Sequence, residues 1–509
     1  MGKSIMVQGT TSNAGKSLFS AALCRIFKQD GYKVAPFKSQ NMALNSFITH
    51  EGLEMGRAQV MQAEAAGIAP TASMNPILLK PTGDTGSQVI VRGEVLGNMS
   101  ARDYYAYKRE LRPVVEETYA ELAAQNDIVV IEGAGSPAEI NLKADDFVNM
   151  GMAKIARSPV LIVGDIDRGG VFASLYGTVA LLESDEQAMV KATVINKFRG
   201  DVSLLEPGLE TLRELTGVPV LGVVPYLRLD IDDEDSLSER IETVDSTGKP
   251  VDVAVIRLPH VSNFTDLNAL ARYPQLGVRY VERPDQLREP DLIVLPGTKN
   301  TMDDLDWLRR IGLEAPIKAR AAAGALVLGI CGGYQMLGTH LSDPHGVERG
   351  GEMEGMGLLP TETVFTQAKR RTRVKATTLP LFGGPFKPLS ETTLDGYEIH
   401  MGETTLLDSS PTSGVGVFAT LDFEDGRRPE PDGCVAGNVL GTYCHGLFDD
   451  GTFPGAFVRL LCERAGVDAT GFPNETLAEY KNRQYDELAS AVRASCDMDL
   501  LYRIVEEGA

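Results

Sequence analysis

The feature that most constrains the fold is a repeated alternation of short, continuously apolar segments with amphipathic ones. From the start of the chain to Tyr226, the apolar runs are SIMVQGT, KVAPFK, DIVVIEGAG, PVLIVGDID, ATVINKF and PVLGVVP, with helical patterns such as KSLFSAALCRIFKQDG between them. Strands that are apolar along their whole length are typical of a parallel sheet covered by helices on both faces. The alternation therefore predicts a doubly wound α/β domain.

A second series of the same kind follows an acidic, polar stretch. VDVAVIRLP, VRYVE, DLIVLPGT, GALVLGIC and GTYCHGLF are predicted strands, and residues 370–430 are expected to add antiparallel ones. A chain of 509 residues is too long for one hydrophobic core. We predict four regions: a first α/β domain at 1–228, a linker at 229–250, a second α/β domain at 251–453 and a helical extension at 454–509.

Composition narrows the partners of this chain. The formal charge of −21 and the pI near 4.8 argue against nucleic acid, whose phosphates require a basic surface. No apolar stretch approaches the length that spans a bilayer, and the first strand leaves no room for a signal peptide. Six scattered cysteines without metal-ligand spacing favour a reduced, cytoplasmic protein.

The most specific motif of the first domain is a glycine-rich turn between its first strand and the next helix. In GTTSNAGKS, five residues separate Gly9 from Gly15, which is one more than in the usual Walker A pattern. Such a loop binds phosphate through its backbone N–H groups, while Lys16 adds charge and the Ser17 hydroxyl can reach Mg²⁺. The alternative is a loop that merely starts a helix. The predicted ATP-binding residues of the loop are Gly9, Thr10, Asn13, Gly15, Lys16 and Ser17.

The longer loop resembles that of the dethiobiotin synthetase-like ATPases, which activate a carboxylate as an acyl phosphate. On this resemblance Lys38, in PFK, is a second phosphate-facing lysine and Asn196, in VINKFRGD, meets the adenine edge. Glu132 ends a predicted strand and is a suitable Mg²⁺ ligand beside Ser17; Glu54 is a candidate for a further ligand. A solvated or capping role remains the alternative for Lys38 and Asn196.

In the second domain, the stretch GICGGYQML places Cys331 between glycines, after a strand and before a helix. This pattern is typical of a nucleophile elbow, a turn so tight that its flanking positions tolerate only glycine. The helix N-terminus would favour the thiolate form of the cysteine. The alternative is a small buried cysteine that fills a strand–helix junction.

Three features favour a catalytic cysteine. His445, in TYCHGLF, follows another predicted strand and is a candidate base. The turn LPGT contains Gly297, whose N–H could form an oxyanion hole together with that of Gly332. Gln335 completes the pattern Gly-x-Cys-x-Gly-x-Gln, which resembles class I, triad-type glutamine amidotransferases. In that class the cysteine attacks the glutamine carboxamide and ammonia is released, so a glutamine-binding role is implied for these residues.

One departure from that class concerns the acid that orients the histidine. Most members carry a glutamate shortly after the histidine, whereas here Gly446 and Leu447 follow it. A Cys–His dyad, or an acid from elsewhere in the chain, is therefore implied, with Glu398 in DGYEIHMG as one candidate. His400, in the same glycine-bounded stretch, is a candidate for lining a substrate or glutamine pocket.

A carboxylate-activating ATPase joined to an ammonia-releasing glutaminase forms amides. The chain resembles the cobyric acid synthase family of cobalamin biosynthesis over nearly its whole length, in strings such as PFKSQNMALNSFIT, GDIDRGGVFAS, VSNFTDLNAL, LPGTKNTMDDLDWLR and GTYCHGLF. The family implies amidation of the b, d, e and g carboxylates of adenosylcobyrinic acid a,c-diamide, with ATP, Mg²⁺ and glutamine. Arg168 is a candidate for binding a corrinoid carboxylate, with a surface ion pair as the alternative.

Two other enzymes and one non-enzyme remain as alternatives. The nearest is cobyrinic acid a,c-diamide synthase, which has the same two-domain build and amidates fewer carboxylates. An isoglutaminyl-type amidotransferase acting on cell-wall precursors usually divides the two activities between separate chains, so the fusion argues against it. A nucleotide-binding switch with a degenerate glutaminase domain is disfavoured by the intact Cys331 and His445.

Overall fold

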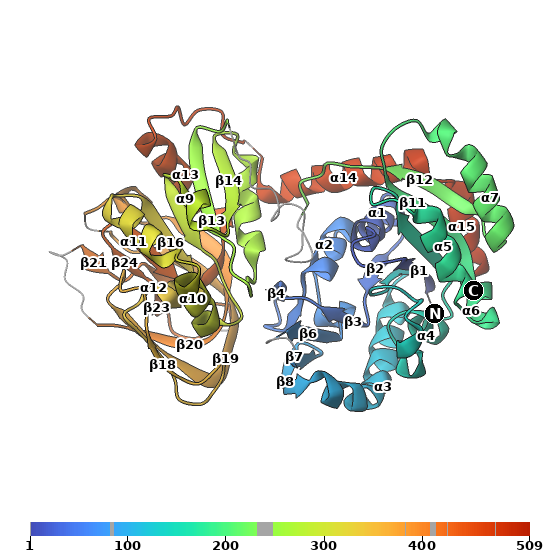
Figure 1. Cartoon of the computed structure of the whole chain (residues 1–509), viewed down its shortest axis with the longest axis horizontal. Coiled ribbons are helices and arrows are strands. Elements are labelled where there is room, and N and C mark those ends of the chain that lie inside the picture. Colours follow the sequence, from blue (N-terminus) through green and yellow to red (C-terminus); the bar gives the residue numbers. More distant parts are fainter. Residues whose placement is uncertain are drawn as a thin grey trace. The chain divides into compact units, whose positions relative to one another are not determined.

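The computed structural model (Figure 1) divides the chain into two compact units. Unit 1 comprises Met1–Ala43, Leu53–Glu234 and Ala478–Ala509, and unit 2 comprises Leu44–Gly52 and Asp235–Leu477. The structure describes residues 2–81, 86–231, 248–381, 383–407, 414–424, 426–473 and 475–509. Most of the predicted linker at 229–250 therefore lies outside the described residues.

The six strands predicted for the first domain form one parallel sheet in unit 1, in the order β12-β11-β10-β1-β9-β2. Because the chain passes from β9 on one side of β1 to β10 on the other, the order reverses at β1, and ligands of doubly wound sheets bind at such a point. The strands are β1 (Lys3–Gly9), β2 (Val34–Phe37), β9 (Ile128–Glu132), β10 (Val160–Asp165), β11 (Val190–Phe198) and β12 (Val220–Pro225).

Helices cover both faces of this sheet, so that each face has its own hydrophobic core. The helices of unit 1 are α1 (Lys16–Gln29), α2 (Arg57–Ala66), α3 (Ala101–Gln125), α4 (Met150–Ala156), α5 (Val171–Ala180), α6 (Ser184–Met189), α7 (Glu206–Thr216), α14 (Leu477–Ser495) and α15 (Met498–Glu507), with short 3₁₀ turns η1 (Ala72–Met74), η2 (Ile140–Asp145) and η3 (Val202–Leu204). A small sheet of β3 (Gln40–Met42), β6 (Ile77–Pro81), β7 (Gly86–Val91) and β8 (Glu94–Ser100), together with β5 (Glu54–Gly56), completes the unit.

Unit 2 contains a second sheet with a parallel centre, in the order β14-β13-β15-β16-β25-β24-β21. Its strands are β13 (Val251–Ile256), β14 (Leu276–Val281), β15 (Leu292–Leu295), β16 (Leu326–Ile330), β21 (Val415–Gly416), β24 (Cys434–Ala436) and β25 (Val439–Thr442). The predicted strand GTYCHGLF is wrong as a single element. It breaks at Tyr443, where the chain leaves β25 and enters the third large sheet.

The third large sheet is mostly antiparallel, as expected for residues 370–430. It contains β17 (His340–Asp343), β18 (Gly351–Glu354), β19 (Thr361–Thr378), β20 (Thr393–Leu406), β22 (Ala419–Phe423), β23 (Glu430–Asp432) and β26 (Cys444–Gly451). The remaining elements of unit 2 are β4 (Ser46–Ile48), η4 (Phe264–Arg272), α9 (Pro284–Leu287), α10 (Thr301–Arg310), α11 (Glu314–Ala322), α12 (Gly332–Leu337), η5 (Lys387–Leu389) and α13 (Phe453–Arg464).

The predicted helical extension at 454–509 is not a region of its own. Helix α13 belongs to unit 2, whereas α14 and α15 pack on unit 1. Their apolar faces, with Leu488, Leu501 and Ile504, enter the same core as β1 and α1. Burial of those faces against a sheet is the physical reason for the difference, because an amphipathic helix is stabilised by the core that it covers.

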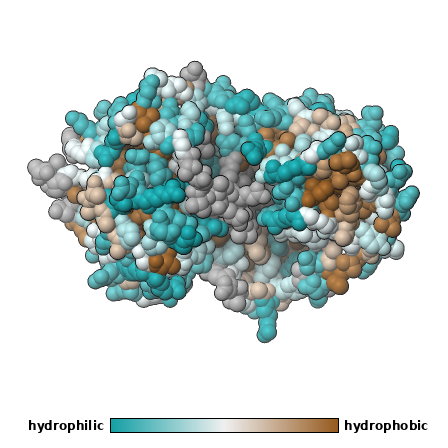
Figure 2. Space-filling model, turned by 45° about the horizontal axis from the view of Figure 1, so that its top comes forward, coloured by the Kyte–Doolittle hydropathy of each residue, from teal (hydrophilic) through white to brown (hydrophobic). Residues whose placement is uncertain are grey.

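One face of the molecule is mainly polar where its residues are described (Figure 2). Figure 2 shows a mostly hydrophilic face on which apolar side chains gather in small patches, as is usual for globular proteins. Within the described part of the chain, no helix combines the length and the apolar character needed to cross a bilayer.

Candidate active site

Cys331 lies at the sharp turn between β16 and α12, as the sequence predicts. Its backbone has φ 52° and ψ −110°, a conformation that residues with a side chain rarely adopt. The neighbouring glycines leave no room for substituents: a Cβ at Gly333 would lie 1.9 Å from the Leu295 carbonyl oxygen, and one at Gly329 would lie 2.5 Å from Leu337 Cδ1. The backbone strain therefore falls on the cysteine itself, as in a nucleophile elbow.

The Cys331 thiol is buried against strand β20. Its Sγ lies 3.6 Å from the carbonyl oxygen of Ile399, and the residue is 7% exposed. Helix α12 has only six residues. The dipole of so short a helix is weaker than the sequence suggested, and the His445 ring lies beside the Cys331 sulfur.

His445 is held by a buried carboxylate that the sequence analysis did not single out. The Nδ1 atom of His445, on β26, lies 2.6 Å from Oδ2 of Asp266, on η4, and the N–H of Gly446 donates to the other oxygen at 3.0 Å. Burial by itself lowers the pKa of His445, but the Asp266 carboxylate and the adjacent Cys331 sulfur raise it, to about 10. The imidazole is therefore positively charged near neutral pH, beside the sulfur.

The carboxylate that contacts His445 is that of Asp266, and the prediction of Glu398 in this position is wrong. Glu398 instead lies 3.3 Å from Arg370 Nε and 3.5 Å from His400 Nε2. One signal was available in the sequence, since Asp266 follows the strand β13, whose carboxyl end shares an edge of the sheet with the end of β16. Side chains that follow the carboxyl ends of parallel strands of one sheet lie along that edge, even where another strand, here β15, separates the two strands.

The two predicted oxyanion glycines lie beside this pair. A Cβ at Gly297, after β15, would lie 3.1 Å from Cε1 of His445, and one at Gly332 would lie 3.1 Å from the backbone nitrogen of Thr298. Any side chain at either position would enter the space next to the histidine or the turn after β15. The fold thus brings Gly297 and Gly332 together with Cys331 and His445.

Gln335, predicted to contact glutamine, is anchored within the protein. Its Oε1 accepts a hydrogen bond from the Thr301 hydroxyl at 2.8 Å, and its Nε2 donates to the Tyr443 hydroxyl at 3.1 Å. The Tyr443 hydroxyl in turn lies 2.6 Å from that of Thr404. These contacts indicate that Gln335 fixes the walls of the site around the elbow.

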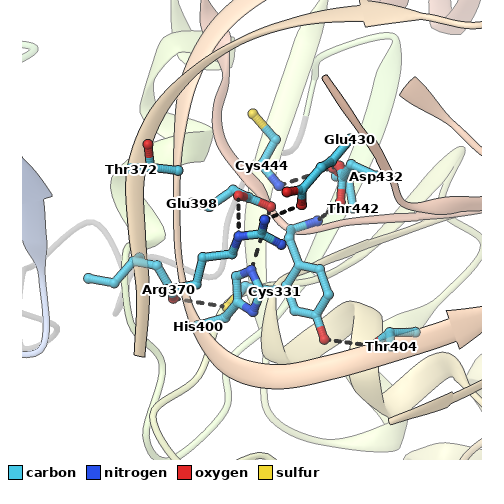
Figure 3. A network of polar contacts seen from close by, with 12 residues as sticks. Cys331, Arg370, Thr372, Glu398, His400, Thr404, Glu430, Asp432, Thr442 and Cys444 are labelled. Carbon is cyan, nitrogen blue, oxygen red and sulfur yellow. Dashed lines mark hydrogen bonds and ion pairs between the residues drawn. The ribbon is translucent and has the colours of Figure 1, made fainter. Parts of the chain in front are cut away.

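His400, predicted to line a pocket, belongs to a buried polar network beside Cys331 (Figure 3). Its ring stacks on Tyr443 with centroids 3.7 Å apart and planes 15° apart, and its Nδ1 lies 2.8 Å from the Gly402 carbonyl oxygen. Arg370 balances the charge by contacting Glu398 and Glu430. This arrangement makes His400 part of the framework of the site.

Asp432 lies in the same network. Burial raises its pKa to about 6, and the charge of Glu398 adds to the effect, whereas hydrogen bonds from Thr442 and from the Tyr443 N–H oppose it. Asp432 contacts Thr442 and Tyr443, where β25 ends and β26 has not yet begun. These contacts therefore fix the backbone just before His445.

The glycine-rich loop of unit 1 has the geometry expected of a phosphate site. Asn13 and Gly15 have φ values of 59° and 95°, left-handed conformations of the kind found in loops whose N–H groups bind anions. A Cβ at Gly9 would lie 3.0 Å from the Lys16 side chain, so glycine allows that side chain to fold over the loop. The N–H of Thr10 donates to the Val163 carbonyl at 3.0 Å and ties the start of the loop to β10.

Glu132 forms hydrogen bonds with two other predicted residues of this site. Its carboxylate accepts hydrogen bonds from the Ser17 hydroxyl at 2.9 Å and from Lys38 Nζ at 2.8 Å. Gln62 of α2, which the sequence analysis missed, donates to its second oxygen at 2.5 Å. Glu54 forms a separate buried ion pair with a lysine, at 2.9 Å. The Ser17 and Glu132 oxygens suit a hard cation such as Mg²⁺, although the described residues hold no group of three or more His, Cys, Asp or Glu side chains arranged for a metal.

Asn196 and Arg168 differ in how much of each side chain is available to a ligand. The Nδ2 atom of Asn196 donates to the Ala14 carbonyl of the loop at 3.0 Å, which favours a role in holding the loop over direct contact with adenine. The Arg168 side chain, after β10, is 68% exposed, and its Nε lies 3.9 Å from Asp165. Its guanidinium therefore remains accessible to an anion.

The fold and the two sites define a class: a glutamine amidotransferase joined to a nucleotide-binding domain of P-loop type. Two family models match the chain accordingly. The CobQ/CobB/MinD/ParA nucleotide binding domain matches residues 5–237, and the CobB/CobQ-like glutamine amidotransferase domain matches residues 252–453. Among solved structures, a glutamine amidotransferase aligns with a TM-score of 0.30, at 20% identity over 42% of this chain and 99% of its own.

Similar proteins identify the family. Proteins named cobyric acid synthase are 57% identical in Ruminiclostridium cellulolyticum, over 100% of this chain and 98% of the relative, and 56% identical in Lachnoclostridium phytofermentans, over 100% of both. The corresponding protein of Yersinia enterocolitica is 51% identical over 100% of this chain and 99% of its own. The chain belongs to the cobyric acid synthase family.

Proposed function

We propose that this chain uses ATP and glutamine to amidate the b, d, e and g carboxylates of adenosylcobyrinic acid a,c-diamide, yielding adenosylcobyric acid. The observation that carries the proposal is a buried Cys331–His445–Asp266 array at a strained elbow, in a chain that shares 57% identity with a cobyric acid synthase over its full length. The phosphate site of unit 1 supplies the second half of the chemistry.

For glutamine hydrolysis, the Cys331 sulfur attacks the carboxamide carbon while His445, protonated on Nε2, gives its proton to the departing ammonia. Asp266 accepts the Nδ1–H bond and stabilises the imidazolium. Backbone N–H groups at Gly297 and Gly332 receive the oxyanion. Water, deprotonated by His445, then hydrolyses the thioester to glutamate and restores the thiol.

For amide formation, a corrinoid carboxylate attacks the γ-phosphorus of ATP and ADP leaves. Lys16 and Lys38 offset the negative charge that spreads over the phosphoryl oxygens. Ser17 and Glu132 would hold Mg²⁺, which when bound neutralises phosphate charge. Ammonia then attacks the acyl phosphate carbon and phosphate leaves, so each amide consumes one ATP and one glutamine.

Two further assignments belong to this proposal. The exposed guanidinium of Arg168 binds a carboxylate of the corrinoid, so Arg168→Ala should raise the KM for the corrinoid and leave that for glutamine unchanged. The reaction takes place in the cytoplasm, which agrees with six cysteines that are all free thiols.

The test is incubation of the full-length protein with adenosylcobyrinic a,c-diamide, MgATP and glutamine, followed by mass spectrometry. We expect four successive mass steps, each matching one acid-to-amide conversion, with equal amounts of ADP and glutamate. Amidation of cobyrinic acid that stops after two steps, with no reaction of the a,c-diamide, would instead identify a cobyrinic acid a,c-diamide synthase.

A further inference from the structure

A short segment from the first part of the chain belongs structurally to the glutaminase unit. The chain leaves unit 1 after Ala43, contributes residues 44–52 to unit 2, and returns to unit 1 at Leu53. Strand β4 (Ser46–Ile48) lies within this segment. Each of its three residues contacts a neighbour of one member of the Cys331–His445–Asp266 array.

The first contact reaches His445 through an aromatic ring. Tyr397 of β20 lies directly opposite His445 of β26 in the sheet, and their rings stack with centroids 5.2 Å apart and planes 18° apart. Phe47 packs on Tyr397 with ring centroids 6.0 Å apart, and the Arg373 guanidinium lies 5.5 Å from the Phe47 ring. Phe47 therefore helps to set the plane of the tyrosine on which a positively charged imidazole rests, a favourable arrangement for both rings.

The second and third contacts reach the other two members. The backbone N–H of Ser46 donates to Oδ1 of Asn263 at 3.1 Å, and Asn263, with φ 52°, is the N-cap residue that directly precedes the 3₁₀ helix η4, which carries Asp266. Ile48 forms a small buried cluster with Tyr397 and Ile399. The carbonyl oxygen of Ile399 is the group against which the Cys331 sulfur lies.

We propose that β4 is a positioning element of the glutaminase site, in which Phe47 acts on His445 through Tyr397. The three residues of β4 together contact Asn263, Tyr397 and Ile399, which adjoin Asp266, His445 and Cys331 respectively. Contacts to the neighbours of all three members of the array are not expected of a strand that only fills space. The proposal rests on the glutaminase function assigned to Cys331, and it means that the second half of the sequence lacks part of its own active site. Small displacements of reacting groups reduce rates by up to about 100-fold, so loss of the Phe47 ring should lower the turnover of glutamine.

The test compares substitutions at Phe47 in the full-length protein. Phe47→Leu keeps an apolar side chain but removes the ring, and Phe47→Tyr keeps the ring. The matched control is His50→Ala, which alters an exposed side chain just beyond β4. Glutamine hydrolysis gives kcat and KM, and amidation of the corrinoid with ammonium salts in place of glutamine reports the phosphate site and the integrity of the fold.

We expect Phe47→Leu to lower kcat for glutamine about tenfold with little change in KM, and Phe47→Tyr and His50→Ala to keep the original kcat. Amidation with ammonium should be unchanged in all three. An unchanged kcat in Phe47→Leu would overturn the positioning role, as would a parallel loss of ammonium-dependent amidation, which indicates general damage to the fold. Glutamine hydrolysis that persists in Cys331→Ser would instead overturn the proposed function.

Discussion

Asp266 is the residue on which the chemistry of His445 depends most directly. It contacts both the ring Nδ1 of His445 and the backbone N–H that follows it, so it fixes the ring orientation and its charge. A carboxylate that holds a catalytic histidine in this way is worth several powers of ten in turnover in serine proteases, where asparagine in its place stabilises the wrong tautomer. The same reasoning applies to a cysteine nucleophile.

We expect Asp266→Asn to lower kcat for glutamine hydrolysis by about 100-fold or more. Ammonium-dependent amidation should be unchanged, because it does not use His445. Glu398→Gln should have a much smaller effect on kcat, since Glu398 contacts Arg370 and His400 rather than His445. Equal losses in the two variants would show that neither carboxylate specifically orients the histidine.

Because the pKa of His445 is raised beside Asp266, the free energy of unfolding should depend on pH. The pKa is about 10 in the folded protein and about 6.5 in an unfolded chain. Folding therefore favours the protonated ring, and its stabilising contribution is complete below about pH 6.5 and is lost as the pH rises toward about 10. The difference in unfolding free energy between the original protein and Asp266→Asn should shrink over that range, measured by denaturant titration.

Residues close together in sequence could be predicted, whereas those joined only by the fold could not. Cys331 and its glycines form one string, and the structure confirms the elbow. Asp266 lies 179 positions from His445, and Gln62 lies 70 positions from Glu132. No local motif marks either residue: Asp266 shows only that it follows a predicted strand, and its role depends on which strand ends share an edge of the sheet.

At the level of elements, the strands were predictable and the placement of the last helices was not. Continuous apolar runs identify buried parallel strands, and all six predicted for the first sheet are present. An amphipathic helix shows that one face is buried but does not show against which core. Similarly, the run GTYCHGLF gives no sign that the chain changes sheets at Tyr443, since both parts are apolar and extended.

We expect the packing of α15 on unit 1 to contribute substantially to its stability. Leu501 is fully buried in the core that contains β1 and α1. Leu501→Ala should lower the free energy of unfolding by about 2–5 kcal/mol, as truncation of buried leucines usually does. The control is Arg503→Ala, an exposed position on the same helix, which should change it by less than about 0.5 kcal/mol. Similar small effects for both variants would contradict the packing described for α15.

At the scale of the whole molecule, the chain combines a phosphate site in unit 1 with a thiol site in unit 2. The two sites carry out different steps: one activates an acid with ATP, and the other releases ammonia from glutamine. Because different residues carry the two steps, a single substitution can remove either one. Cys331→Ser leaves the phosphate loop intact, and Lys16→Ala leaves the cysteine site intact.

The most direct test of the account is to follow nitrogen from glutamine labelled with ¹⁵N in its amide, in the presence of unlabelled ammonium, MgATP and the a,c-diamide corrinoid. We predict that the unsubstituted protein places the label in the new amides. Cys331→Ser should form amides from unlabelled ammonium alone, and Lys16→Ala should form none while still hydrolysing glutamine. Label in the product of Cys331→Ser, or amides formed by Lys16→Ala, would contradict the central claim that the Cys331 site supplies nitrogen to an acid activated at the phosphate loop.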